Sequence, residues 1–169
     1  LPLRQIVKDT GAELVTIDYK ETLNTDFSIF NAVIMSGSPR GDDIVDHHLP
    51  YFQWIKSYDQ PILGICAGHH ITGKLYGAEI IRDKEKEVGD LLVFIEHRDP
   101  IFEGYSDKFL ATQNHHDSIT LPDSFIRLAH TTKCRNSMMK HKEKPIYTTQ
   151  FHPEILNIKI VQNFLALPV

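Results

Sequence analysis

Short apolar runs separated by mixed segments are the main pattern in the first half of the chain. Three of these runs have the length of buried strands, and they lie at residues 13–18, 32–35 and 62–66. The intervening segments have helical spacing or length, at residues 3–10, 49–57 and 67–76. Strands that alternate with helices indicate a parallel sheet with helices on both of its faces.

The second half has a different pattern, because turns rather than helices join its apolar runs. Short strands are predicted at residues 91–95, 109–112, 126–131, 137–141 and 146–151, and a closing helix at residues 158–165. No repeat or linker divides the 169 residues, so we expect one domain over residues 1–169. The predicted fold class is α/β, with a flavodoxin-like, open, mostly parallel sheet, helices on both faces, and additional antiparallel strands in the C-terminal half.

The third apolar run leads into Gly64-Ile65-Cys66-Ala67-Gly68, which predicts a sharp turn between a strand and a helix. A side chain displayed on such a turn needs neighbours without a Cβ atom, and the two glycines provide them. The cysteine would then lie at the N-terminus of the next helix, where unpaired backbone N–H groups favour the thiolate. The stretch therefore predicts a nucleophile elbow that carries Cys66.

A second signal, His152-Pro153-Glu154, follows the last predicted strand. Proline favours an extended backbone in the residue before it, so side chains two positions apart point to the same side. A carboxylate in that position can orient the imidazole, as a base beside a thiol nucleophile requires. The loop Ser36-Gly37-Ser38-Pro39, Cys66 and His152 all follow predicted strands, so we expect them to meet at the carboxyl ends of the sheet. The leading hypothesis is a Cys-His-Glu triad.

Composition and charge argue against several other classes of protein. The formal net charge is −4, and basic and acidic residues are mixed without a basic stripe, so we expect no nucleic-acid partner. No apolar stretch approaches the roughly 20 residues of a membrane span, and no secretory signal is visible, so we expect no membrane contact and a cytoplasmic location. Cys66 and Cys134 are predicted to be free thiols, because an elbow cysteine locked in a disulfide could not react.

Four motifs in the chain resemble those of the class I, or triad, glutamine amidotransferases. The family's Gly-x-Cys-x-Gly elbow corresponds to residues 64–68, its His-Pro-Glu to residues 152–154, and its Ser-Gly-Gly-Pro loop to residues 36–39. Residues 113–119 resemble the segment that presents backbone groups to the substrate glutamine. The resemblance covers nearly the whole chain, and residues 136–154 look most like the amidotransferase subunit or domain of GMP synthetases.

The resemblance implies hydrolysis of the side-chain amide of glutamine, with the ammonia supplied to an ATP-dependent synthetase subunit in a reaction like GMP synthesis. Cys66 would attack the amide, His152 would protonate the departing ammonia and then activate water, and Glu154 would hold His152 in place. No cofactor is implied.

The resemblance also assigns roles around the triad. The backbone N–H groups of Ser38 and Ala67 would receive the oxyanion. The residues expected to bind the substrate glutamine, partly through backbone atoms, are Gly37, His70, Asn114, His116 and Asp117.

This chain departs from the family pattern at three points. His70 stands where the family usually has glutamine, which could weaken glutamine binding or alter specificity. Ser38 replaces the second glycine of the loop, although a serine still offers its backbone N–H. Family members begin with a strand and a loop ahead of the first helix, whereas this sequence starts inside that helix. We therefore expect the N-terminal strand to be absent from the chain.

Three alternatives stay open. The first alternative is a metal site, suggested by the histidine pairs at residues 47–48, 69–70 and 115–116. Adjacent histidines on a strand point to opposite faces and cannot bind one ion together, so no metal is predicted. A non-catalytic regulator with this fold is favoured by His70 and opposed by the intact triad. A γ-glutamyl hydrolase or peptidase of the same fold would use the same triad with a differently shaped pocket.

Overall fold

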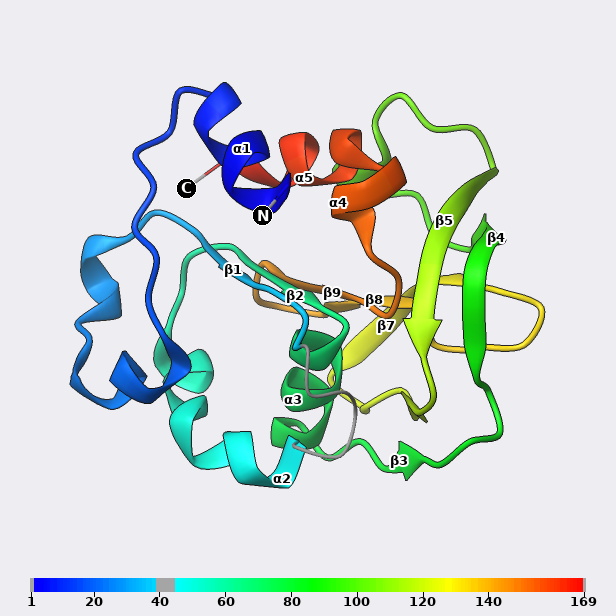
Figure 1. Cartoon of the computed structure of the whole chain (residues 1–169), viewed down its shortest axis with the longest axis horizontal. Helices are drawn as coiled ribbons and strands as arrows, with labels where there is room; N and C mark the ends of the chain where they lie inside the picture. Colours follow the sequence, from blue (N-terminus) through cyan, green and yellow to red (C-terminus); the bar gives the residue numbers. More distant parts are fainter. Residues whose placement is uncertain (1, 39–44, 169) are drawn as a thin grey trace.

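A seven-stranded sheet forms the centre of the part of the chain that the structure describes (Figure 1). This structure is a computed structural model, and it describes residues 2–38 and 45–168. The strand order is β1-β2-β9-β8-β7-β4-β5. The parallel half consists of β1 (Val33–Met35), β2 (Ile62–Ile65) and β9 (Ile146–Thr149). The antiparallel half consists of β8 (Met138–His141), β7 (Phe125–His130), β4 (Glu87–Ile95) and β5 (Lys108–His115). The predicted α/β fold class, with antiparallel strands in the C-terminal half, is confirmed.

Helices lie on both sides of the parallel half (Figure 1). On one side, α1 (Pro2–Asp9), α4 (Pro153–Leu156) and α5 (Ile158–Leu165) pack against one another. On the other side lie α3 (Ala67–Leu75) and the short α2 (Val45–His48). The helices predicted near the start, after the elbow and at the end of the chain are therefore confirmed.

The strand that precedes the cysteine, β2, is buried on both faces. Leu63 and Ile65 pack into one core cluster, which also contains Phe151. Ile62 points to the opposite face and packs into a second cluster with Ile55. All four residues of β2 are buried, and fully burying an aliphatic side chain stabilises a fold by about 1.5–3 kcal/mol. The elbow is therefore attached to one of the firmly packed strands of the sheet.

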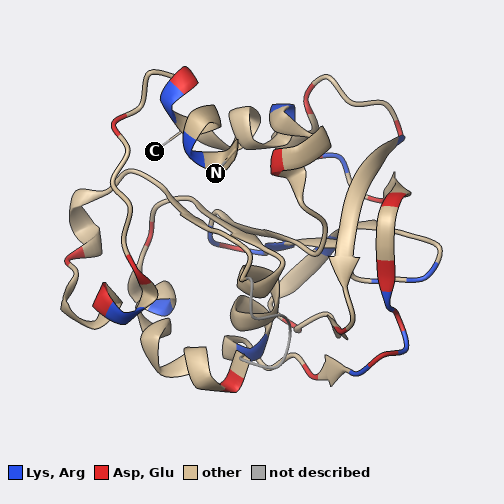
Figure 2. Ribbon diagram, in the orientation of Figure 1, with Lys and Arg blue, Asp and Glu red and all other residues tan. Residues whose placement is uncertain are grey.

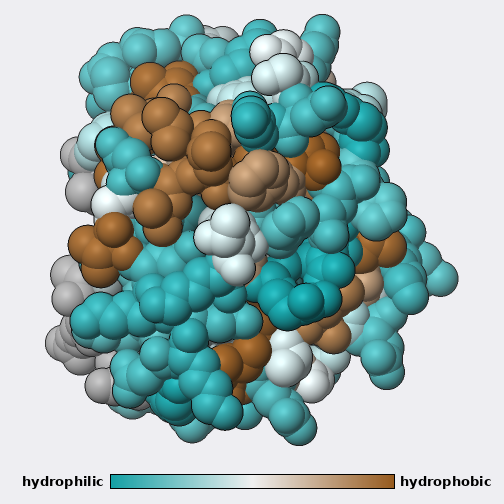
Figure 3. All heavy atoms as spheres, turned by 90° about the vertical axis from the view of Figure 1, so that its right-hand side faces the viewer, coloured by the Kyte–Doolittle hydropathy of each residue, from teal (hydrophilic) through white to brown (hydrophobic). Residues whose placement is uncertain are grey.

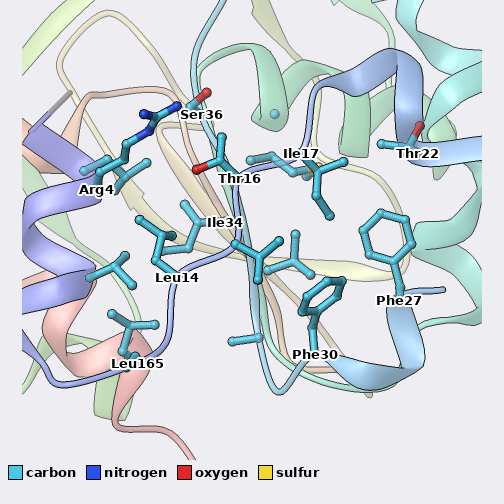
Figure 4. A pocket seen from close by; sticks show the side chains of 18 of the residues that line it. Arg4, Leu14, Thr16, Ile17, Thr22, Phe27, Phe30, Ile34, Ser36 and Leu165 are labelled. Carbon is cyan, nitrogen blue, oxygen red and sulfur yellow. The ribbon is translucent and has the colours of Figure 1, made fainter. Parts of the chain in front are cut away.

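The prediction of a strand at residues 13–18 is wrong. The segment takes part in neither of the described sheets, although its residue pattern is typical of a strand. A cavity of about 1790 Å³ is lined on one side by this segment and on the other by β1 (Figure 4). Neighbouring strands must approach to about 4.8 Å to form a ladder of hydrogen bonds. The segment therefore lacks a partner at the required distance.

Apolar side chains line much of this cavity, among them Leu14, Phe30, Ile34 and Leu165 (Figure 4). The cavity also extends to Ala67, the residue after the predicted nucleophile. β1 ends the strand order of the described sheet, and the cavity lies along its outer side. One edge of the parallel half is thus open, next to the loop that leads into the candidate site.

Several short elements differ from the prediction or were missed by it. Residues 49–57, predicted as a helix, form two 3-10 helices, η4 (Leu49–Tyr51) and η5 (Gln53–Ser57), rather than one α-helix. Pro50 in η4 has no N–H to continue a regular helix. The other short elements, too brief to show a period, are η1 (Tyr19–Asn24), η2 (Phe27–Ile29), η6 (Pro100–Phe102), α4, β3 (Ile80–Ile81) and β6 (Ser118–Ile119).

Charged residues are spread over the described surface, with basic and acidic segments side by side (Figure 2). None of the described helices combines the length and the apolar character needed to cross a bilayer. The cytoplasmic location stays a prediction.

Candidate active site

Cys66 occupies the turn between β2 and α3, as the sequence predicts. Its φ is +52°, in the left-handed region that residues other than glycine rarely adopt. The Cys66 N–H donates to the Thr149 carbonyl of β9 at 2.8 Å, and the Cys66 carbonyl accepts from the N–H of His69 at 3.0 Å. A backbone strain of about 1–3 kcal/mol is typical of such residues, and hydrogen bonds on both sides hold it here.

Close backbone approach explains both glycines of the elbow. A Cβ atom added at Gly64 would lie 2.8 Å from the carbonyl oxygen of Gly68. A Cβ atom added at Gly68 would lie 3.1 Å from the carbonyl oxygen of Met35 on β1. Backbone oxygens cannot rotate away as a side chain can. The two glycines therefore allow the first turn of α3 to sit directly against β2 and β1.

The segment between β9 and α4 brings His152 next to this cysteine, and Glu154 follows in the first turn of α4. The His152 N–H donates to the Thr112 carbonyl of β5 at 2.9 Å, which fixes the backbone. Its Nδ1 atom lies 2.9 Å from Oε1 of Glu154. Hydrogen bonds with the Cys66 side chain and with Glu154 raise the pKa of His152 to about 10. These contacts favour a charged imidazolium beside the Cys66 sulfur, which places an acid next to the candidate nucleophile.

The loop after β1 forms a third side of the site. A Cβ atom added at Gly37 would lie 3.1 Å from Cε1 of His152 and 3.5 Å from Cβ of Cys66. The loop therefore passes against both side chains, and the three predicted segments meet at the carboxyl ends of β1, β2 and β9. Ser38 belongs to this loop and Ala67 is the first residue of α3. Their role as oxyanion-hole donors stays a prediction.

Three other predicted glutamine-binding residues lie on β5 and in the turn that follows it. Asn114 is exposed on β5. His116 is exposed, with its Nδ1 atom 4.0 Å from Asp83. Asp117 is buried, and its carboxylate forms an ion pair with Arg82. Their roles in glutamine binding stay predictions, and Pro39 of the predicted loop lies outside the described residues.

His70 is fully buried in α3, behind the nucleophile. Its Nε2 atom lies 2.7 Å from Oε1 of Gln150, and Nε2 of Gln150 lies 4.0 Å from the sulfur of Cys66. His70 therefore reaches the thiol through a second side chain, and its direct role in glutamine binding stays a prediction. The motifs did not point to Gln150, whose one signal in the sequence was its position two residues before His152.

A separate buried group joins Glu87, His115 and Cys134, whose potential ligand atoms lie within 4.8 Å of one another. His115 Nδ1 lies 2.9 Å from the Asp117 carbonyl and its Nε2 3.0 Å from Glu87, which also accepts from Thr131 at 2.6 Å. Burial, followed by the neighbouring carboxylates, raises the pKa of the Cys134 thiol far above its usual value. Hydrogen bonds thus occupy the ligand atoms of Glu87 and His115, and the group holds β4, β5 and the turn before β8 together.

Comparison with known sequences points to one family. The sequence model of the family described as "Glutamine amidotransferase class-I" matches residues 3–165. The chain is 32% identical to a glutamine-hydrolysing GMP synthase subunit of Thermoplasma acidophilum, over 98% of this chain and 83% of that protein. It is 40% identical to the protein of the same name from Methanococcus aeolicus, over 62% of this chain and 58% of that protein.

Solved structures share the fold. A protein from Thermoplasma acidophilum, described as a GMP synthase subunit, has a TM-score of 0.82 at 29% identity, and the match covers 96% of this chain and 84% of that one. A glutamine amidotransferase from Thermotoga maritima has a TM-score of 0.79 at 21% identity, and the match covers 97% of this chain and 74% of that one. At 21% identity, the similarity to the Thermotoga maritima protein shows a shared fold and nothing further.

Proposed function

Because the chain belongs to the class I glutamine amidotransferase family, we propose that Cys66, His152 and Glu154 form the triad with which it hydrolyses glutamine. The observation that carries this proposal is the contact of His152 with both partners, which raises its pKa to about 10. A charged imidazole beside a strained cysteine supplies an acid and a nucleophile at one point.

In the first half of the reaction, the Cys66 sulfur attacks the amide carbon of glutamine, and the electrons of the C=O bond move to the oxygen. The N–H groups of Ala67 and Ser38 receive this oxyanion, where losing one such donor typically costs about 3 kcal/mol of barrier. The C–N bond then breaks as His152 donates its proton to the nitrogen. Ammonia leaves, and a glutamyl thioester remains on Cys66.

In the second half, neutral His152 takes a proton from a water molecule, which attacks the thioester carbon. The C–S bond breaks, glutamate leaves after its new carboxyl group gives up the second water proton to solvent, and the proton on His152 restores the charged imidazole beside the thiolate. Glu154, 2.9 Å from Nδ1, holds the ring in one orientation through both halves. One water is consumed for each ammonia and glutamate released.

We further propose that the ammonia passes to an ATP-dependent synthetase subunit that makes GMP. The relatives are named as subunits of a GMP synthase, and this name supports such a partner. An exposed apolar surface also supports it, formed by Leu92 and Leu110 on β4 and β5 and by Ile155 and Leu156 on α4 (Figure 3). Apolar patches of this kind mark interaction sites, and α4 starts directly after His152.

Incubation of the purified chain with glutamine tests the triad. Ammonia and glutamate should appear in equal amounts, and Cys66→Ser should lower the rate by about 10³-fold or more. Cys134→Ser is the control, because that buried thiol belongs to a different group of side chains, and it should retain the activity. Full activity in Cys66→Ser would overturn the assignment.

The same assay separates the alternatives when γ-glutamyl peptides replace glutamine. Faster hydrolysis of the peptides than of glutamine would identify a γ-glutamyl hydrolase. Turnover of neither substrate, together with no covalent labelling of Cys66 by a glutamine-like electrophile, would identify a regulator that keeps the fold without the reaction.

A further inference from the structure

Gln150 is the polar side chain that reaches the nucleophile from behind. It follows β9, has 0% of its surface exposed, and its backbone N–H donates to the Ser137 carbonyl at 2.8 Å. The backbone is therefore fixed by the residue just before β8, and the side chain is shielded from bulk water. Its amide must find partners inside the protein, and the partners it has are His70 and Cys66.

The two contacts of this amide determine its orientation. The amide oxygen lies 2.7 Å from Nε2 of His70 and can only accept a hydrogen bond, so Nε2 of His70 carries the hydrogen. The amide nitrogen, a donor, is then turned toward the sulfur of Cys66, 4.0 Å away. With the other tautomer of His70 the amide would turn over and place its oxygen against the sulfur.

We infer that Gln150 presents a hydrogen-bond donor to the Cys66 thiolate, and that His70 is a positioning residue that acts through Gln150. A donor stabilises a thiolate, whereas an oxygen in the same place would repel it. The tautomer of His70 therefore determines whether the Gln150 amide stabilises or destabilises the thiolate. This inference rests on the proposed function for its meaning in catalysis, but it concerns the resting protein and needs no substrate for its test.

Other titratable groups lie beside Cys66, His152 or His70. His152 contacts Cys66 directly, and Glu154 of α4 contacts the far side of the His152 ring. On α3, the ring of His69 lies 5.9 Å from that of His70. Burial, and then repulsion from His70, holds the pKa of His69 well below its usual value. His69 therefore carries no charge at neutral pH.

Alkylation of Cys66 by iodoacetamide from pH 5 to pH 10, followed by peptide mass spectrometry on the full chain, tests the inference. Gln150→Met removes the donor and should raise the midpoint pH of alkylation by about one unit, which corresponds to about 1.4 kcal/mol. Gln150→Glu places an oxygen against the sulfur and should raise it further. His70→Met should shift the midpoint in the same direction by less, and adding it to Gln150→Met should produce no further shift.

Two variants serve as controls. His70→Gln keeps a donor for the Gln150 oxygen and should titrate like the wild type. His69→Gln changes a neighbouring, equally buried histidine that contacts Thr148 and Asn136 instead, and it should not move the midpoint. Circular dichroism establishes which variants are folded.

Wild-type midpoints in folded Gln150→Met and His70→Met would overturn the inference. If Gln150→Met does not fold, an unchanged midpoint in folded His70→Met overturns it alone. A different result would contradict the proposed function alone. If the alkylation midpoints shift as expected but the chain releases no ammonia from glutamine, the proposed function is wrong and the role of Gln150 is still supported.

Discussion

The two sides of strand β1 differ sharply in packing. On the inner side, β2 is fully buried, and the elbow leaves no room for a Cβ atom at Gly64, which would lie 2.8 Å from a backbone oxygen. On the outer side, a cavity of about 1790 Å³ separates β1 from residues 12–18. The position of the nucleophile is thus determined from β2, β9 and α3, and little support comes from the cavity side.

The loop at residues 36–38 connects the two regions. It follows β1, lines the cavity, and passes against Cys66 and His152 at Gly37. A change on the cavity side can therefore reach the site through β1, whereas a change on the elbow side acts on it directly. We therefore expect a substitution on the elbow side to cost more stability than a matched substitution on the cavity side.

The largest effect is expected at the closest backbone approach. Gly64→Ala should destabilise the fold by about 4 kcal/mol or more, because neither backbone segment can move aside. Gly11→Ala is the matched change at the start of the cavity segment, where φ is +84° but no atom lies within 4 Å. It should cost only about 1–2 kcal/mol of backbone strain. Urea denaturation measures both, and equal losses would show that the elbow is not tightly packed.

A smaller contrast is expected for two leucines. Leu63→Ala in β2 should cost about 2–5 kcal/mol, because Leu63 has no exposed surface. Leu14 lines the cavity, so Leu14→Ala should lower the free energy of unfolding by less than about 1 kcal/mol, since its surroundings are already open to water. The same denaturation experiment compares them. A cost at Leu14 as large as that at Leu63 would mean that the cavity is filled in solution.

The charge on His152 adds an electrostatic link between the elbow and α4. Its pKa is raised above the ordinary value of 6.5 to about 10, so its contribution to stability is fully present below pH 6.5 and is lost as the pH rises through 10. The difference in melting temperature between wild type and His152→Gln should therefore shrink by several degrees between pH 6 and pH 10.5. A constant difference over this range would contradict the ion pair.

The smallest effect concerns the strain at the nucleophile. Because φ of Cys66 is +52°, glycine is the residue that tolerates this backbone best. Cys66→Gly should be more stable than Cys66→Ala by about 1 kcal/mol, although both lose the sulfur. Thermal denaturation of the two variants is the comparison, and a less stable glycine variant would show that the turn is relaxed.

The elbow and the His-Pro-Glu segment could be predicted from the sequence because their chemistry is local. The glycines at positions 64 and 68 are needed within one turn, and His152 and Glu154 are two positions apart. The helix and strand that flank Cys66 also carry clear patterns, which is why the elbow lies where it was predicted.

Other features depend on neighbours that a single segment does not reveal. Residues 13–18 have the composition of a strand, but a ladder needs a partner at pairing distance, and the cavity separates this segment from the open edge of β1. The contact between His70 and Gln150 joins positions 80 apart in the chain. No periodicity or motif connects two such residues, so only the fold shows that His70 lies behind the thiol.

Covalent labelling is the most direct test of the proposed triad. The full chain is treated with a glutamine analogue that carries a diazoketone in place of the amide, and the modified peptide is identified by mass spectrometry. We predict one adduct, on Cys66, which excess glutamine prevents. An adduct on Cys134, or none on a Cys66 that iodoacetamide still alkylates, would contradict it.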